Sequence, residues 1–161
     1  MPIDPDLLRN AMRQWATGVT VVTAEHNGVR HGMTVNSFTS VSLTPPLILV
    51  SLERTTRTHA LVEKSSHFGV TILSDQQQEV SDCFAGRIER EDRFSNLETH
   101  TLVSGSPLIS GGLAYLDCRV VTEYEAGTHT LFIAEVLVAA SSTGEADGGP
   151  LLYYNRSYHR L

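Results

Sequence analysis

Turn residues divide the chain into short segments in which apolar and polar side chains alternate, and this period of two constrains the fold most. The alternation is strictest over residues 113–125. One face holds Ala114, Leu116, Cys118 and Val120, and the other holds Asp117, Arg119, Glu123 and Glu125. Such a pattern is typical of a half-buried antiparallel strand. We therefore expect a sheet protein in which charged residues of this segment face solvent.

Further strands are predicted at residues 19–26, 29–38, 47–52, 68–73, 128–141 and 150–154. Asn27-Gly28 is a strong hairpin signal, and Ala126-Gly127 predicts a second tight turn. Helices are predicted from Pro5 to Gly18, from a cap at Thr55 or Thr56 to about Lys64, and from a Ser74/Gln77 capping box to about Gly86. Residues 142–150 are expected to be a flexible connection. The pattern predicts one domain over residues 1–161, an antiparallel β-barrel with a few peripheral helices.

Composition excludes several classes of function. The net charge of −6 argues against general nucleic-acid or anionic-membrane binding. The N-terminus lacks the pattern of a signal peptide, and no apolar run approaches the roughly 20 residues that span a bilayer. Cys83 and Cys118 are expected to be buried thiols in a reducing compartment. We therefore expect a cytoplasmic protein.

Common catalytic motifs are missing from the sequence. It contains no GxGxxG, GxxxxGK[ST], HExxH or GxSxG pattern. The seven histidines show no paired ligand spacing, so no metal site is expected. If the protein is an enzyme, its reactive atoms belong to a bound cofactor rather than to its side chains.

A polar run precedes the double proline Pro45-Pro46. It contains Thr34, Asn36, Ser37, Thr39, Ser40 and Ser42. Hydroxyl and amide groups at this spacing suit either the wall of a flat, polar-edged ligand or the exposed face of a strand, and the residues alone favour neither. Because proline cannot donate to a sheet ladder, we expect the strand to break at Pro45-Pro46, before a buried strand from Leu47 to Leu52.

A second candidate segment, residues 51–59, lies where this strand gives way to a helix. Helix N-terminal N–H groups, hydroxyls and Arg54 or Arg57 would suit a phosphate, and simple helix capping with solvated arginines is the equal alternative. In the charged loop of residues 85–94, Arg90 is interpreted as solvated, whereas Phe94 is expected to pack on other residues. His129 is interpreted first as a structural hydrogen-bonding residue. Tyr153 and Tyr154 are either strand aromatics or ligand contacts.

Taken in order, these segments resemble the flavin reductase-like family, the short-chain reductase components of two-component flavin-dependent monooxygenases. The resemblance spans nearly the whole chain. The matching segments are "WATGVTVVTA", "GMTVNSFTSVSLTPPLILVSL", "FGVTIL", "DRF", "GSPLI", "GTHTLFIAEV" and "PLLYYNRSYHRL". The resemblance implies a mainly β (α+β) fold, an antiparallel FMN-binding split barrel with Greek-key character. Members of the family are usually homodimers.

The resemblance also implies an activity, its cofactors and its site. The family reduces FMN, or FAD, with NADH or NADPH, and the reduced flavin diffuses to a partner monooxygenase. Carried over by position, three segments bind the flavin: Thr34, Val35, Asn36 and Ser37 at the ring; Ser51, Leu52, Glu53 and Arg54 with Arg57 and Thr58 at the ribityl phosphate; and Ala85, Gly86 and Arg87 from the next loop. His129 matches the family's histidine near the nicotinamide and is the expected catalytic residue.

Two features of this chain differ from what the family often shows. Thr128 stands where the family often has an aspartate before His129, so that carboxylate is missing. The tail after Tyr154 is short, so no long C-terminal lid is expected.

A non-catalytic FMN-binding split-barrel protein is the alternative function. The sequence does not decide between NADH and NADPH, or between FMN and FAD, and it does not name the partner oxygenase.

Overall fold

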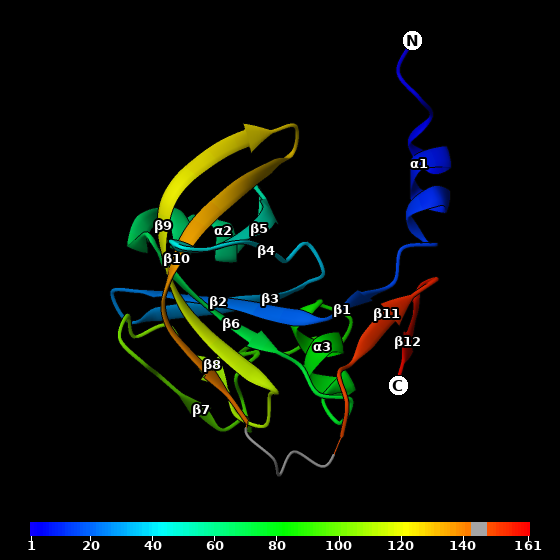
Figure 1. Ribbon diagram of the computed structural model, residues 1–161. Coiled ribbons are helices and arrows are strands. Elements are labelled where there is room, and N and C mark those ends of the chain that lie inside the picture. Colours follow the sequence, from blue (N-terminus) through cyan, green and yellow to red (C-terminus); the bar gives the residue numbers. More distant parts are fainter. Residues whose placement is uncertain (143–147) are drawn as a thin grey trace.

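The computed structural model describes residues 1–142 and 148–161 (Figure 1). Its helices are α1 (Pro5–Met12), α2 (Arg57–Ser65) and α3 (Gln78–Phe84). Its strands are β1 (Thr17–Gly18), β2 (Thr20–His26), β3 (Val29–Val35), β4 (Thr39–Leu43), β5 (Pro46–Glu53), β6 (His67–Ile72), β7 (Thr99–His100), β8 (Leu108–Ile109), β9 (Ala114–Ala126), β10 (His129–Ser141), β11 (Leu152–Tyr154) and β12 (Ser157–His159). A mainly β fold with few helices is thus confirmed.

Seven strands form the main sheet in the order β3-β2-β6-β9-β10-β5-β4, and every neighbouring pair is antiparallel. The sheet must be strongly curved, since side chains from strands near both of its edges contribute to one apolar core. Val22 of β2 and Val35 of β3 belong to the same buried cluster as Val50 of β5. Leu61 and Val62 of α2 close that cluster. The curvature brings β3, β5 and the start of α2 together, and this is where the candidate site lies.

The first helix is shorter than predicted and stands apart from the sheet (Figure 1). It ends at Met12 rather than at Gly18, and it has no buried residue. Leu7, Leu8 and Met12 are each more than half exposed, at 59%, 53% and 55%. The apolar periodicity therefore predicts the helix correctly but not a packing partner for it within this chain.

Thr44 and Pro45 form the hairpin turn between β4 and β5. Pro46 is the first residue of β5, a position at which the missing N–H removes no ladder bond. Only alternate residues of β5 are buried: Ile48, Val50 and Leu52 face the core, while Leu47 and Leu49 are partly exposed. The predicted strand from Leu47 to Leu52 is confirmed, but it is buried only at alternate residues.

Asp117 of β9 is fully buried, whereas its place on the polar face predicted exposure. Its Oδ2 accepts a hydrogen bond of 2.7 Å from the backbone N–H of Ser104, and Oδ1 has no partner among the described residues. The loop that carries Ser104 covers this part of the sheet. Alternation within a strand predicts which residues share a face of the sheet. It does not predict that a distant loop will cover one of these faces.

The C-terminal segment forms a hairpin, β11–β12, that pairs with β1 in a separate three-stranded sheet. Its turn, Asn155-Arg156, has φ values of 48° and 63°, and β12 was not predicted. Residues 143–147 of the expected flexible connection lie outside the described residues. Gln77 accepts a hydrogen bond from Ser74 N–H as a capping box predicts, although α3 begins only at Gln78.

Candidate functional site

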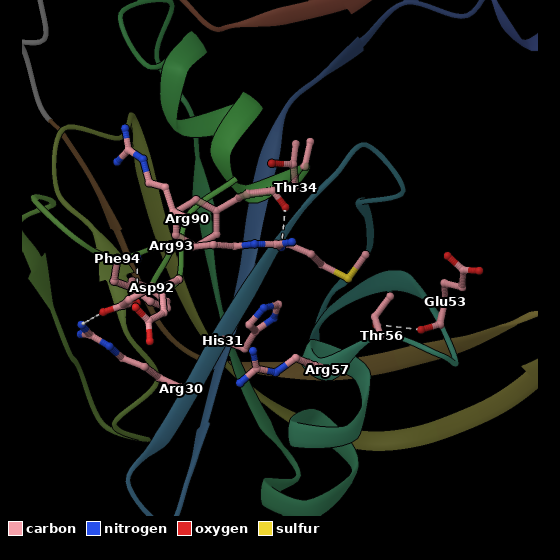
Figure 2. A pocket seen from close by; sticks show the side chains of 14 residues that line it. Arg30, His31, Thr34, Glu53, Thr56, Arg57, Arg90, Asp92, Arg93 and Phe94 are labelled. Carbon is pink, nitrogen blue, oxygen red and sulfur yellow. Dashed lines mark hydrogen bonds and ion pairs between the residues drawn. The ribbon is translucent and has the colours of Figure 1, made fainter. Parts of the chain in front are cut away.

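A cleft of 510 Å³ lies between β3, the start of α2 and the loop that follows α3 (Figure 2). Of the predicted site residues, Thr34, Glu53, Arg57 and Ala85 line it. Its other lining residues include Arg30, His31, Thr56, Arg90, Asp92, Arg93 and Phe94. Residues from three separate parts of the sequence therefore line one concave cleft, as is typical of a ligand-binding site.

The N-terminus of α2 opens onto this cleft. The side chain of Thr56 caps the helix by accepting a hydrogen bond of 3.3 Å from His59 N–H. The N–H groups of Arg57 and Thr58, in the first turn, have no partner within the helix and carry the positive end of its dipole. Over the described residues the Arg57 guanidinium forms no hydrogen bond or ion pair, so it is available to an anion.

His31 lies on β3 beside Arg57 and was not predicted as a site residue. Its Nδ1 is 2.8 Å from the hydroxyl of Thr58, which is itself fully buried. Burial, and then the positive charges of Arg93 and Arg57, lower the pKa of His31 from 6.5 to about 4. The imidazole is therefore neutral at pH 7, and the positive charge of the cleft comes from arginines alone. Sequence spacing could not reveal this contact, because Thr58 lies 27 residues away.

The loop after α3 is tied to β3 rather than free in solvent. Arg93 donates hydrogen bonds of 2.9 Å to the carbonyl oxygens of both Gly32 and Phe84. Phe94 is 3% exposed and packs edge-to-face on Phe84, with ring centroids 5.1 Å apart. The expectation that Phe94 packs on other residues is confirmed. Arg90 is not freely solvated, because it pairs with Glu79 at 2.7 Å.

A smaller cavity of 160 Å³ lies on the other side of the predicted ring-binding segment. It is lined by Thr34, Val35 and Asn36, by Ala85 and Arg87, and by Tyr153 and Tyr158 from the C-terminal hairpin. Thr34 borders both cavities, and its hydroxyl donates a hydrogen bond of 2.7 Å to the carbonyl of Ser81. Asn36 also borders a third cavity, of 740 Å³, together with Ser37, Met12 and Trp15.

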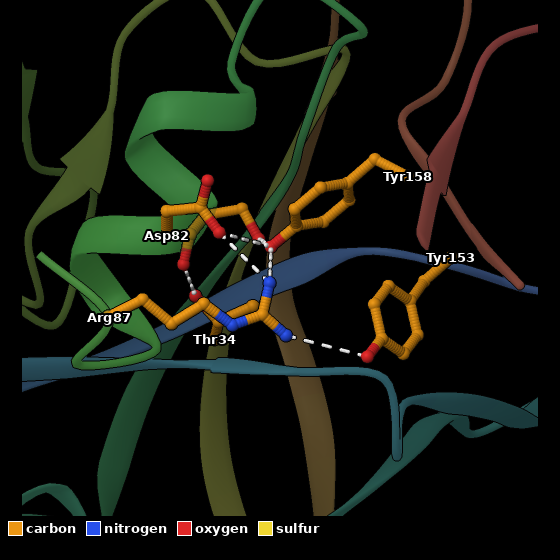
Figure 3. Close-up of polar contacts among 6 residues, drawn as sticks. Thr34, Asp82, Arg87, Tyr153 and Tyr158 are labelled. Carbon is orange, nitrogen blue, oxygen red and sulfur yellow. Dashed lines mark hydrogen bonds and ion pairs between the residues drawn. The ribbon is translucent and has the colours of Figure 1, made fainter. Parts of the chain in front are cut away.

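Arg87 links the loop after α3 to the C-terminal hairpin (Figure 3). Its guanidinium donates to Asp82 at 3.0 Å, to the Tyr158 hydroxyl at 3.3 Å and to the Tyr153 hydroxyl at 3.4 Å. The hydrogen bond to Asp82 raises the pKa of Arg87 above its ordinary value. The Tyr158 hydroxyl also contacts Ser81 at 2.7 Å, and burial raises its pKa. Gly86, which precedes Arg87, has a φ of 76° that favours glycine.

Ser37 and Ser51 hold the β3–β4 connection against β5. The Ser37 hydroxyl donates to the carbonyl oxygen of Ser51 at 2.7 Å and accepts from its N–H at 3.2 Å. Leu52 is fully buried in the core, so only its backbone is available to a ligand. Arg54 pairs with Glu125 at 3.1 Å and does not line the cleft. Of this segment, Glu53 is the residue whose side chain the structure brings to the cleft.

His129 begins β10 opposite Glu53 of β5, outside the cleft but next to a residue that lines it. Its Nδ1 lies 2.9 Å from the hydroxyl of Thr128. The residue that replaces the family's aspartate thus still contacts the imidazole. A hydroxyl orients the ring without adding the negative charge of a carboxylate.

The donor set of the cleft fits the phosphate of a flavin nucleotide. Free N–H groups at a helix N-terminus and an unpaired guanidinium are the groups that proteins use for phosphate. Over residues 1–142 and 148–161, no three His, Cys, Asp or Glu side chains are grouped as metal ligands. In the same part of the chain, no helix is long and apolar enough to cross a membrane.

Comparison with known proteins agrees with this chemistry. A 4-nitrophenol 4-monooxygenase/4-nitrocatechol 2-monooxygenase reductase component from Rhodococcus opacus is 41% identical over 153 residues, 95% of this chain and 79% of that protein. The NADH-dependent flavin reductase StyB of Pseudomonas fluorescens is 40% identical over 159 residues, 98% of this chain and 90% of that protein. The structure of the flavin reductase PheA2 in its native state has a TM-score of 0.89 and 42% identity over 99% of both chains. Since the family model for the flavin reductase like domain matches residues 12–161, the chain belongs to that family.

Proposed function

We propose that this protein reduces FMN or FAD with NADH or NADPH and releases the reduced flavin to a partner flavin-dependent monooxygenase. Two similar proteins, one a monooxygenase reductase component and one an NADH-dependent flavin reductase, support this function. The observation that carries it is the cleft lined by Thr34 of β3, by the α2 N-terminus and by Arg57, whose guanidinium has no partner among the described residues. This arrangement supports a phosphate site beside the polar segment predicted to bind the ring.

The proposed division of roles follows the cavities. Thr34, Val35, Asn36 and Ser37 line the ring, and Arg57 with the first turn of α2 binds the phosphate. From the end of β5, the proposed contributions are backbone groups of Ser51 and Leu52 and the side chain of Glu53 in the cleft wall. The loop after α3 closes the site from the opposite side with Ala85, Gly86 and Arg87. Arg54 is paired with Glu125, so its proposed contact with the ligand requires that ion pair to open. Thr58 acts through His31, whose ring it contacts.

Bound flavin supplies the chemistry, because its ring system accepts a hydride from a reduced nicotinamide. The residues of this chain bind and orient the two reactants, which makes the reaction effectively unimolecular. His129, held by the Thr128 hydroxyl, is proposed to position the nicotinamide carboxamide. Backbone N–H groups of the Thr34–Ser37 segment are proposed to bind the polar edge of the ring.

Steady-state oxidation of NADH or NADPH with excess FMN or FAD tests the proposal. We expect turnover well above the rate without protein. Absence of such turnover, with flavin still bound, would instead indicate a non-catalytic flavin-binding protein. Arg57→Ala is expected to weaken FMN binding, whereas Arg119→Ala, on the exposed surface and paired with Glu135, should not. Equal flavin affinity in wild type and Arg57→Ala would contradict the phosphate site.

We also propose that residues 1–161 form one domain and that two copies form a homodimer. The exposed apolar side chains of α1 support the dimer, because Leu7, Leu8 and Met12 have no partner in the described part of this chain. Light scattering on the purified protein would measure the mass directly, and a monomer mass at micromolar concentration would refute the dimer. A cytoplasmic location is proposed because Cys83 and Cys118 are both buried and free.

A further inference from the structure

The cleft reaches sideways from the place proposed for the phosphate to Arg30. In Figure 2 Thr34 lies in the upper part of the cleft, whereas Arg57 and Arg30 lie in its lower part, with Arg30 to the left of His31 and Arg57. Four residue steps along an extended strand lead from Arg30 to Thr34, a span of about 13 Å. A mononucleotide with its ring at Thr34 and its phosphate at Arg57 leaves the side of the cleft beside Arg30 free for another group.

The guanidinium of Arg30 lies over an aromatic ring on this side of the cleft. Its Cζ is 4.5 Å from the ring centroid of Phe94, a cation–π distance. Asp92 fixes the arrangement, since its Oδ2 pairs with Arg30 at 3.4 Å and its Oδ1 accepts a 2.9 Å bond from Phe94 N–H. The side chain of Arg30 remains 42% exposed and lines the cleft, so a ligand can contact it there.

The charges around Arg30 favour a neutral aromatic group over a second strong anion. Arg93 is occupied by two backbone carbonyls, and Arg90 is paired with Glu79. Asp92 already offsets the charge of Arg30 itself. A purine base is uncharged and flat, and proteins bind such bases by stacking them on aromatic rings or on arginine guanidinium planes.

We propose that Arg30, supported by Phe94, is the stacking surface for the adenine of a dinucleotide whose phosphates bind at the N-terminus of α2. The inference rests on the proposed function of this cleft and extends it to the adenosine half of the ligand. Two dinucleotides of the proposed reaction carry that half, FAD and the reduced nicotinamide nucleotide. Arg30 thereby determines how strongly the protein prefers a dinucleotide to a ligand such as FMN that lacks adenosine.

Arg30→Lys tests the proposal, because lysine keeps the charge that attracts phosphate but has no flat face for stacking. Dissociation constants for FMN and for FAD are measured by flavin fluorescence with the wild-type protein, Arg30→Lys and the surface control Arg119→Lys. KM for NADH is measured with saturating FMN. Circular dichroism melts establish that all three proteins are folded.

A loss of affinity confined to adenosine-containing ligands would support the proposal. We expect Arg30→Lys to weaken FAD binding roughly tenfold and FMN binding less than twofold. If the adenine comes from the nicotinamide nucleotide, KM for NADH rises by a similar factor while both flavin affinities stay unchanged. Equal weakening of FMN and FAD, or no change in any of the three values, would overturn the proposal. A wild-type protein that binds no flavin would instead refute the proposed function itself.

Discussion

Replacing Gly32 with alanine tests how the cleft wall is packed. Gly32 lies on β3 under the last residue of α3, and a Cβ there would be 2.8 Å and 2.9 Å from Cε1 and Cδ1 of Phe84. It would also lie 3.0 Å from the Cγ2 of Thr23. Phe84 cannot move aside easily, because it is 1% exposed and packs against Phe94. The added methyl group must therefore push α3 away from β3.

Overpacking of this kind costs about 1–3 kcal/mol of the free energy of unfolding. In a protein of 161 residues, where 1 kcal/mol corresponds to about 2–4 °C, the melting temperature should fall by roughly 2–12 °C. Because Phe84 lines the cleft and its carbonyl binds Arg93, flavin affinity should fall as well. Thermal melts followed by circular dichroism measure the first effect, and flavin fluorescence titration measures the second.

Gly18→Ala is the matched control for Gly32→Ala. A Cβ at Gly18 meets no atom within 4 Å, and Gly18 is not among the glycines with positive φ. We expect its melting temperature to equal that of the wild type or to rise slightly, because alanine restricts the unfolded chain. A wild-type melting temperature for Gly32→Ala, or equal falls in both variants, would refute the packing argument.

Three further predictions concern the charged groups of the site. Arg57→Ala should raise the FMN dissociation constant about tenfold or more, and Arg57→Lys should restore part of the loss, as titration would show. The pKa of His31 is about 4 in the folded protein against 6.5 ordinarily, so the unfolded chain takes up a proton first and stability is lost as pH falls from 6.5 toward 4. Urea unfolding at pH 7.5 and pH 5 measures how much free energy of unfolding each protein loses on acidification. The loss should be about 1–2 kcal/mol smaller in His31→Asn than in the wild type, a value reduced for solvent screening of a half-buried ring. Equal losses in the two proteins would contradict the pKa shift. Tyr158→Phe should lower the free energy of unfolding by about 1–2 kcal/mol, and by less in an Arg87→Met background, since the two side chains share a network.

Features set by neighbouring residues were predictable from the sequence. The hairpin at Asn27-Gly28 is confirmed, with φ values of 52° and 81° that these two residue types tolerate. A threonine cap of α2, predicted at Thr55 or Thr56, is confirmed at Thr56. In both cases the physical cause, a backbone conformation or one capping bond, acts within a few residues.

Features that depend on distant contacts were not predictable. Nothing in the residues around Asp117 announces the loop at Ser104 that buries it. The turn at Asn155-Arg156 places an arginine at positive φ, a position without a sequence signal. In the site, the resemblance supplied Thr34 and Arg57, but the contact of Arg30 with Phe94 joins residues far apart along the chain. This pair forms because the loop after α3 folds back onto β3, where Arg93 binds the carbonyl oxygen of Gly32.

The separation of α1 from the sheet also gives the protein an intrinsic optical probe. Trp15, the only tryptophan of the chain, follows this helix and is 68% exposed. It lines the 740 Å³ cavity together with Asn36 and Ser37, so its indole lies beside the segment proposed to bind the flavin ring. Its emission should have the long wavelength of an indole in water. Any second molecule that covers α1 would shift that emission to shorter wavelength, so a simple fluorescence spectrum reports assembly at this face.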